Sequence, residues 1–189
     1  NVGQQNQIIP ADETDMILMG YLAFFDAPKK TAKASVAALK RLKVTPKILT
    51  GDQADVAVSV CRRVGISSEN VLTGANLDEM TDSELSTAVE NIHVFAELTP
   101  GQKVRLVSTL RQNGHTVGFL GDGINDIPAL CDANVGISVD TAVDAAKDAA
   151  DVVLLQKDLG VLEQGILEGR KTFTNMLKYI KITASSNFG

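Results

Sequence analysis

The chain has 189 residues, of which 44% are hydrophobic, so it is long and apolar enough for one domain with a sizeable core. Its formal net charge of −5 argues against the basic surface that non-specific nucleic-acid binding requires, so we expect no nucleic-acid partner. The sequence contains neither a secretory signal pattern nor an apolar run of about 18 residues, the length that a membrane-spanning helix needs.

The apolar pattern predicts strands that alternate with helices along the chain. A polar lead-in over residues 1–15 precedes a long apolar strand over residues 16–30, which stops at Asp26–Pro28. Val36, Leu39 and Leu42 follow at helical spacing. Further strands are predicted over residues 47–52, 94–98, 116–122, 135–139 and 151–155. Further helices are predicted over residues 53–65, 81–91, 99–114, 125–133, 142–150 and from Leu159 to about Ile182.

Short, continuously apolar strands that alternate with helices are typical of a parallel sheet covered on both faces. We therefore predict an α/β fold with a doubly wound, mostly parallel sheet. The two cysteines, Cys61 and Cys131, lie in helical segments without metal-like neighbours, and the chain has only two histidines. This pattern favours reduced, half-buried thiols of a cytosolic protein over a zinc site.

Ligands of such sheets bind beyond the carboxyl ends of the strands, and polar groups gather at these positions. Thr50 and Gly51 follow the strand at Ile48–Leu49, where a hydroxyl and a backbone amide can donate two hydrogen bonds to one oxyanion. Lys103 lies near the N-terminus of a predicted helix, where it adds a full charge to a dipole that already favours an anion. These residues predict a site for a phosphate oxygen.

Acidic residues follow the strand that ends at Leu120. Asp122 stands between two glycines, and Asn125 and Asp126 lie just beyond it. Carboxylates on such a loop are the hard oxygen ligands that Mg²⁺ takes. A hydroxyl, an amide, a lysine and a metal-binding carboxylate together fit phosphoryl transfer, which needs mainly positioning and charge neutralisation.

Each of these pieces alone also has a structural explanation. Thr50–Asp52 fits a simple turn after a strand, Lys103 fits a solvated helix residue, and Asp122 fits a helix N-cap. The ordered set, with each piece at a strand end or helix start, favours the phosphoryl site.

The same three pieces resemble the haloacid dehalogenase superfamily. KILTGD resembles its second motif, Lys103 its third and GDGINDIPAL its fourth. The fit is closer to one branch, the P-type cation-transporting ATPases, and specifically to their phosphorylation domain and its link to the membrane. FFDAPKK is similar to that branch's Asp-Pro-Pro-Arg/Lys stretch, with Ala27 where the first proline is usual. FAELTPGQKVRLV and VGISVDTAVDAAKDAADVVLL resemble two further stretches, so the resemblance covers nearly the whole chain from about Met16.

The last residues narrow the resemblance. KYIKITASSNFG looks most like the bacterial magnesium-importing ATPases, and the calcium and sodium pumps look different there. The resemblance thus implies an ATP-driven magnesium importer, with catalytic Mg²⁺ as cofactor and ATP as substrate. Another P-type cation pump, for calcium or protons, is the alternative within the family.

The resemblance also implies a role for each site residue. Lys103, Thr50 and Asp126 would be the catalytic residues. Asp122 and Asp126 would form the metal site, and Asn125, which would help to order their loop, would also contact phosphate or nucleotide. The other roles belong to residues that contact the phosphoryl group or the nucleotide: Thr50 and Gly51 would bind phosphoryl oxygens, Lys103 would offset their charge, and Asp52 would position the site and contact nucleotide.

The family's nucleophile is an aspartate in an Asp-Lys-Thr-Gly-Thr stretch, and this sequence contains no such stretch. Asp26 has Pro28 where a phosphatase of the superfamily would carry a second aspartate, so we interpret Asp26 as a structural or hinge residue. A free-standing phosphatase that uses Asp26 and a non-catalytic Mg²⁺-binding module remain alternatives.

We therefore expect the phosphate and Mg²⁺ half of a larger pump's site, inactive in isolation. The resemblance implies a lead-in over residues 1–15, a phosphorylation domain over 16–158 and a stalk helix over 159–189, on the cytoplasmic side of a bacterial inner membrane. Its partners would be the nucleotide-binding, actuator and transmembrane domains of the same polypeptide. Without the central nucleophile strand, two sheet edges would be exposed, which predicts self-association or a rearranged sheet.

Overall fold

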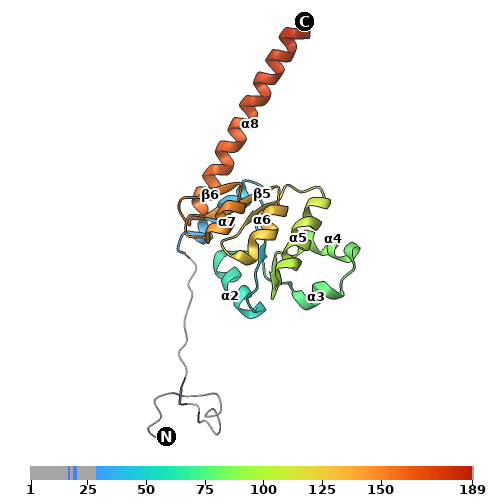
Figure 1. Cartoon of the computed structure of the whole chain (residues 1–189), viewed down its shortest axis with the longest axis vertical. Helices are drawn as coiled ribbons and strands as arrows, with labels where there is room; N and C mark the ends of the chain where they lie inside the picture. Colours follow the sequence, from blue (N-terminus) through green and yellow to red (C-terminus); the bar gives the residue numbers. More distant parts are fainter. Residues whose placement is uncertain (1–16, 18, 21–28, 189) are drawn as a thin grey trace.

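The computed structural model describes residues 17, 19–20 and 29–188, with side chains described up to residue 186. Helices and short strands mostly alternate through this part of the chain. Figure 1 shows how the elements are arranged. The helices are α1 (Ala32–Arg41), α2 (Ala54–Val64), α3 (Gly74–Glu79), α4 (Asp82–Asn91), α5 (Pro100–Gln112), the 3₁₀ turn η2 (Ile124–Asp126), α6 (Ile127–Asp132), α7 (Asp144–Ala149) and α8 (Leu159–Phe188). The strands are β1 (Ile48–Leu49), β2 (Val71–Thr73), β3 (Val94–Ala96), β4 (Gly118–Leu120), β5 (Val135–Val139) and β6 (Val152–Leu154).

The first sheet has the order β1-β3-β2, and all its pairs are parallel. Its central strand is covered on both faces, because successive side chains of a strand point to opposite sides. Val94 and Ala96 pack with the buried residues of α1 and α2, whereas Phe95 packs with those of α3, α4 and α5. The continuous apolar run in the sequence therefore reflects burial on both faces.

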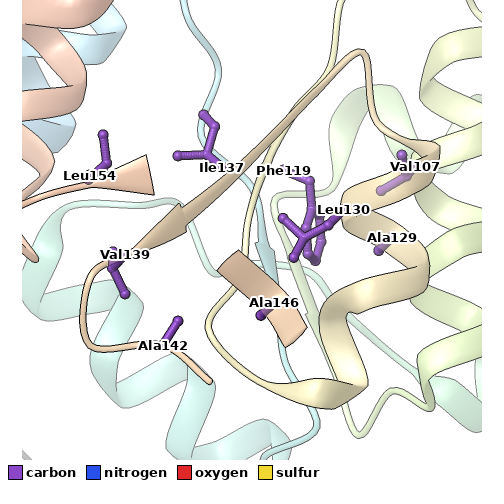
Figure 2. Packing of buried hydrophobic residues seen from close by; sticks show 9 residues of the cluster. All are labelled: Val107, Phe119, Ala129, Leu130, Ile137, Val139, Ala142, Ala146 and Leu154. Atoms are coloured by element: carbon purple, nitrogen blue, oxygen red, sulfur yellow. The ribbon is translucent and has the colours of Figure 1, made fainter. Parts of the chain in front are cut away.

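The second sheet has the order β4-β5-β6 and is also parallel. Figure 2 shows the nine buried side chains of its core, which come from its strands, from α5 to α7 and from the segment before α7. Leu49 of β1 packs against this core and also against the core on the α3–α5 side of the first sheet. The two sheets thus share buried contacts although no strand pair joins them among the described residues.

The predicted parallel α/β fold is confirmed, with one correction to its sheet. The strands form two three-stranded sheets, with β1 at an edge of one and β4 at an edge of the other. The element β2 and the helix α3 were not predicted, because the polar residues around Val71–Thr73 mask a strand of three residues. The strand expected over residues 16–30 falls largely outside the described residues. Of its described positions, Ile17 and Met19 are exposed and belong to no strand.

Local signals explain where the helices begin and end. Thr81 caps α4 by accepting a hydrogen bond from the Glu84 amide, while the Glu84 carboxylate accepts one from the Thr81 amide. Thr99 caps α5 in the same way, with Pro100 in its first turn. Gly65 ends α2 in the left-handed conformation, with φ of 80°, which glycine adopts without strain.

Helix α8 begins on the domain and then projects away from it (Figure 1). Val161 and Leu162 pack against the core of the second sheet, and the Arg170 guanidinium donates a hydrogen bond to the Leu42 carbonyl at 2.7 Å. Beyond this contact its apolar side chains are exposed, among them Phe173. The helix predicted from Leu159 is therefore present and extends past Ile182. No helix in the described residues is both long and apolar enough to cross a membrane.

Both cysteines are free thiols in helices, but neither is half-buried as expected. Cys61 is a fully buried residue of α2, and this burial raises the pKa of its thiol. Cys131 is exposed on α6.

Candidate functional site

A partly buried ion pair lies at the carboxyl end of β4. The Lys103 ammonium, from the first turn of α5, is 2.7 Å from Oδ1 of Asp126 in η2, and the two side chains are only 12% and 15% exposed. The second oxygen of Asp126 accepts a hydrogen bond from the Gly123 amide at 3.3 Å. Asp126 therefore uses both carboxylate oxygens to fix a lysine and the glycine loop.

Gly121 allows this arrangement because it leaves room for Asp126. A Cβ atom at Gly121 would lie 2.5 Å from the Asp126 Cβ and 3.0 Å from its Oδ2, distances at which one of them must move. The Gly121 carbonyl accepts a hydrogen bond from the buried Ser138 hydroxyl at 3.0 Å, and its amide donates to Ile137. The Asp122 carbonyl accepts one from the Val143 amide. The first glycine of GDGIND is thus needed for close packing.

The loop after β1 is held by its own side chains. The Thr50 hydroxyl is 2.9 Å from Asp52 Oδ2 and accepts a hydrogen bond from the Asp52 amide at 3.1 Å. Glu97, which has a positive φ of 56°, supports this loop from the end of β3. Its amide donates to the Asp52 carbonyl, and its carboxylate accepts from the Ala54 amide. Gly51 is exposed at the tip of the loop.

The structure thus gathers the predicted residues into two groups. Thr50 and Asp52 contact each other, and Lys103 contacts Asp126. The groups are linked through the Leu98 amide, which donates to the Thr50 carbonyl one residue before the cap of α5. No hydrogen bond or ion pair runs directly between them in the described residues, and Asn125 is exposed in η2.

The side chains around Asp122 fit Mg²⁺ only in a coordination in which the protein supplies one or two carboxylates. No group of three or more acidic, histidine or cysteine side chains lies close enough to hold a metal within the part of the chain that the structure describes. Mg²⁺ commonly takes one or two carboxylates and completes its shell with waters and phosphate oxygens. The half-exposed carboxylate of Asp122 fits that form, while both oxygens of Asp126 already have partners. The metal roles of these two residues stay predictions.

Lys157, which sequence reasoning did not single out, reaches this site from the carboxyl end of β6. Its ammonium lies 2.7 Å from Asp122 Oδ2, with the two side chains 55% and 52% exposed. One sequence feature could have indicated Lys157. It lies three residues after β6, and β6 belongs to the same parallel sheet as β4, the strand that precedes Asp122. The site therefore holds two lysine–carboxylate pairs rather than the single lysine expected.

A parallel α/β fold with Lys103, Asp122 and Asp126 at its strand ends agrees with the family comparison. The haloacid dehalogenase-like hydrolase family matches residues 3–134, and the chain belongs to this family.

Curated relatives narrow the class further. The chain is 55% identical to the "Magnesium-transporting ATPase, P-type 1" of Escherichia coli K12 over 95% of its length, and 54% identical to the protein of that name from Salmonella typhimurium LT2 over 94%. It is 35% identical to the "Calcium-transporting ATPase 1" of Bacillus cereus over 94% of its length. In each case it spans about 20% of the relative. Among solved structures, it superposes on a zinc-transporting PIB-type ATPase with a TM-score of 0.63 and 29% identity, covering 80% of this chain and 21% of that one.

Proposed function

We propose that this chain is the cytoplasmic phosphorylation part of an ATP-driven, magnesium-importing P-type ATPase. The observation that carries the proposal is the 55% identity to a magnesium-transporting ATPase over 95% of the chain, against 35% to a calcium-transporting one. Lys103 lies in the first turn of the helix after β3, and Asp122 follows β4, so both lie beyond the carboxyl ends of parallel strands. These positions support the proposal, because ligands of parallel sheets bind there.

In this proposal Lys103 stabilises a phosphoryl group that lies beyond the carboxyl ends of the strands. Asp126 holds the ammonium in place at 2.7 Å, so the lysine is positioned before a phosphoryl group arrives. The Gly51 amide binds one phosphoryl oxygen. The Thr50 hydroxyl, which donates to Asp52 Oδ2 at 2.9 Å in this structure, turns its proton from that carboxylate to a second phosphoryl oxygen. Mg²⁺, held by Asp122, would neutralise charge on the phosphoryl oxygens. The attacking aspartate and the ATP pocket would come from elsewhere in the polypeptide.

The long helix α8 has the features expected of a stalk between the phosphorylation domain and the membrane. Its first turns pack on the domain, and its outer part carries Phe173, Met176 and Ile180 on an exposed surface beside several lysines. We propose residues 16–158 as the phosphorylation domain and 159–189 as the link toward the membrane, so that a change at the strand ends alters the position of the stalk.

A chimera tests the proposal. The segment of the Escherichia coli magnesium-transporting ATPase that matches this chain is replaced by it, and growth at low Mg²⁺ and ATP hydrolysis by the purified protein are measured. We expect growth and activity comparable to the unmodified pump. Lys103→Met should lower ATP hydrolysis by about 10²–10³-fold, the typical cost of one preorganised electrostatic contact. A properly inserted chimera that never supports growth or ATP hydrolysis would contradict the proposal.

The alternative of a free-standing phosphatase is tested on the chain itself. It is incubated with Mg²⁺ and acetyl phosphate, and its intact mass is measured at acid pH. We expect no phosphoryl adduct. An adduct at Asp26, which lies outside the described residues, would support the phosphatase instead.

A further inference from the structure

Asp122 is paired with a lysine that none of the predicted site motifs contains. Lys157 approaches its Oδ2 to 2.7 Å, and about half of each side chain is exposed. An ammonium at this distance engages oxygen lone pairs that a divalent cation also needs, and it lowers the negative potential at the second oxygen. Lys157 is therefore placed to compete with any cation that binds Asp122.

The backbone around Lys157 is fixed by several hydrogen bonds. The Lys29 ammonium donates to the Lys157 carbonyl. The Asp158 carboxylate accepts from the Thr31 hydroxyl at 3.1 Å and from the Gly160 amide at 2.7 Å, and the Gly160 hydrogen bond is the main cause that lowers the pKa of Asp158. These contacts limit where the Lys157 side chain can reach.

The same short segment begins helix α8. Asp158 directly precedes Leu159, the first residue of α8, and its carbonyl accepts a hydrogen bond from Val161. A cation that displaces Lys157 from Asp122 therefore releases a side chain anchored at the base of the helix that leaves the domain (Figure 1).

We infer that Lys157 is an internal competitor for the cation at Asp122, which sets the Mg²⁺ affinity of this site and couples its occupancy to the base of α8. The inference rests on the proposed metal role of Asp122. The half-exposed pair exchanges easily, because solvent-exposed ion pairs are weak and are screened by salt. Its removal should therefore tighten Mg²⁺ binding by about two- to fivefold at low ionic strength, with a smaller effect in high salt.

Titration of this chain with Mg²⁺ tests the inference, followed by the NMR shifts of the Gly121 and Gly123 amides. Lys157→Gln should bind Mg²⁺ two- to fivefold more tightly, and Lys157→Arg, which keeps the charge, should stay near the wild type. The matched control is Lys171→Gln, which removes a lysine 2.6 Å from Glu168 on α8, at 66% and 70% exposure, and should leave the affinity unchanged. Mg²⁺ should also shift the Gly160 amide in the wild type but not in Lys157→Gln.

Asp122→Asn separates failure of the inference from failure of the metal assignment. If Asp122→Asn abolishes the Mg²⁺ response while Lys157→Gln and Lys171→Gln bind alike, the competition is refuted and the metal role of Asp122 stands. If the wild type shows no response, or a response that Asp122→Asn leaves intact, the metal role fails and the inference fails with it.

Discussion

The ion pair between Lys103 and Asp126 makes the sharpest prediction about the site. Its two side chains are 12% and 15% exposed and 2.7 Å apart. Removal of one partner from a fully buried pair costs about 3–5 kcal/mol, because the other charge is left without compensation. The residual exposure here places the expected loss for Lys103→Met at about 2–3 kcal/mol in the free energy of unfolding.

Removal of Lys103 and removal of Asp126 should lower the free energy of unfolding by different amounts. In Lys103→Met the short Asp126 side chain stays in place, with only the Gly123 amide as a donor. In Asp126→Asn the flexible lysine can turn its ammonium toward solvent, so the expected loss is smaller, about 1–2 kcal/mol. The double variant should be more stable than the sum of the single losses predicts, by about 1–2 kcal/mol of coupling.

Urea unfolding of the wild type, the two single variants and the double variant measures this coupling. Equal slopes with denaturant concentration would show that the variants unfold to the same extent. Additive losses, with a coupling below about 0.3–0.5 kcal/mol, would refute the argument that these charges stabilise each other.

Two further perturbations have predictable signs. Gly121→Ala should lower stability by about 1–3 kcal/mol, because its Cβ would lie 2.5 Å from the Asp126 Cβ. Gly101→Ala, whose Cβ would meet no atom within 4 Å beyond its own helix backbone, should be neutral or stabilising. The urea midpoints of the two variants test this difference in stability. Burial and, next, the Lys47 and Lys40 charges lower the pKa of His93 below its ordinary 6.5, so its contribution to stability is present above pH 6.5 and is lost as the pH falls through the lowered value. His93→Gln should therefore lose less stability between pH 7.5 and about 5 than the wild type, and equal losses in urea titrations at the two pH values would contradict this.

The alternating elements were predictable from the sequence because their apolar runs are bounded by strong local signals. Thr81 with Glu84 and Pro100 after Thr99 are local signals of a helix start, and in the structure both threonines cap the helices that follow them. Strand β2 escaped prediction because polar residues flank its three positions, Val71–Thr73, whereas the equally short β3 lies in a longer apolar run.

The positions of the site residues were predictable only where they follow directly from the end of a single strand. The position of Asp122 after β4 follows from the chain alone. The partners of the carboxylates do not, since Lys103 meets Asp126 from 23 residues away and Lys157 meets Asp122 from 35 residues away. The split into two sheets likewise depends on strand pairing between distant segments.

The two lysine–carboxylate pairs have the same chemistry and nearly the same length, 2.7 Å, yet burial gives them different roles. The Lys103–Asp126 pair is largely shielded, so its charges interact strongly and a broken pair is costly, which suits a fixed part of the site. The Lys157–Asp122 pair lies half in solvent, where water and salt weaken it and where another cation can replace the lysine. One carboxylate is thus committed to holding a lysine, and the other remains available for exchange.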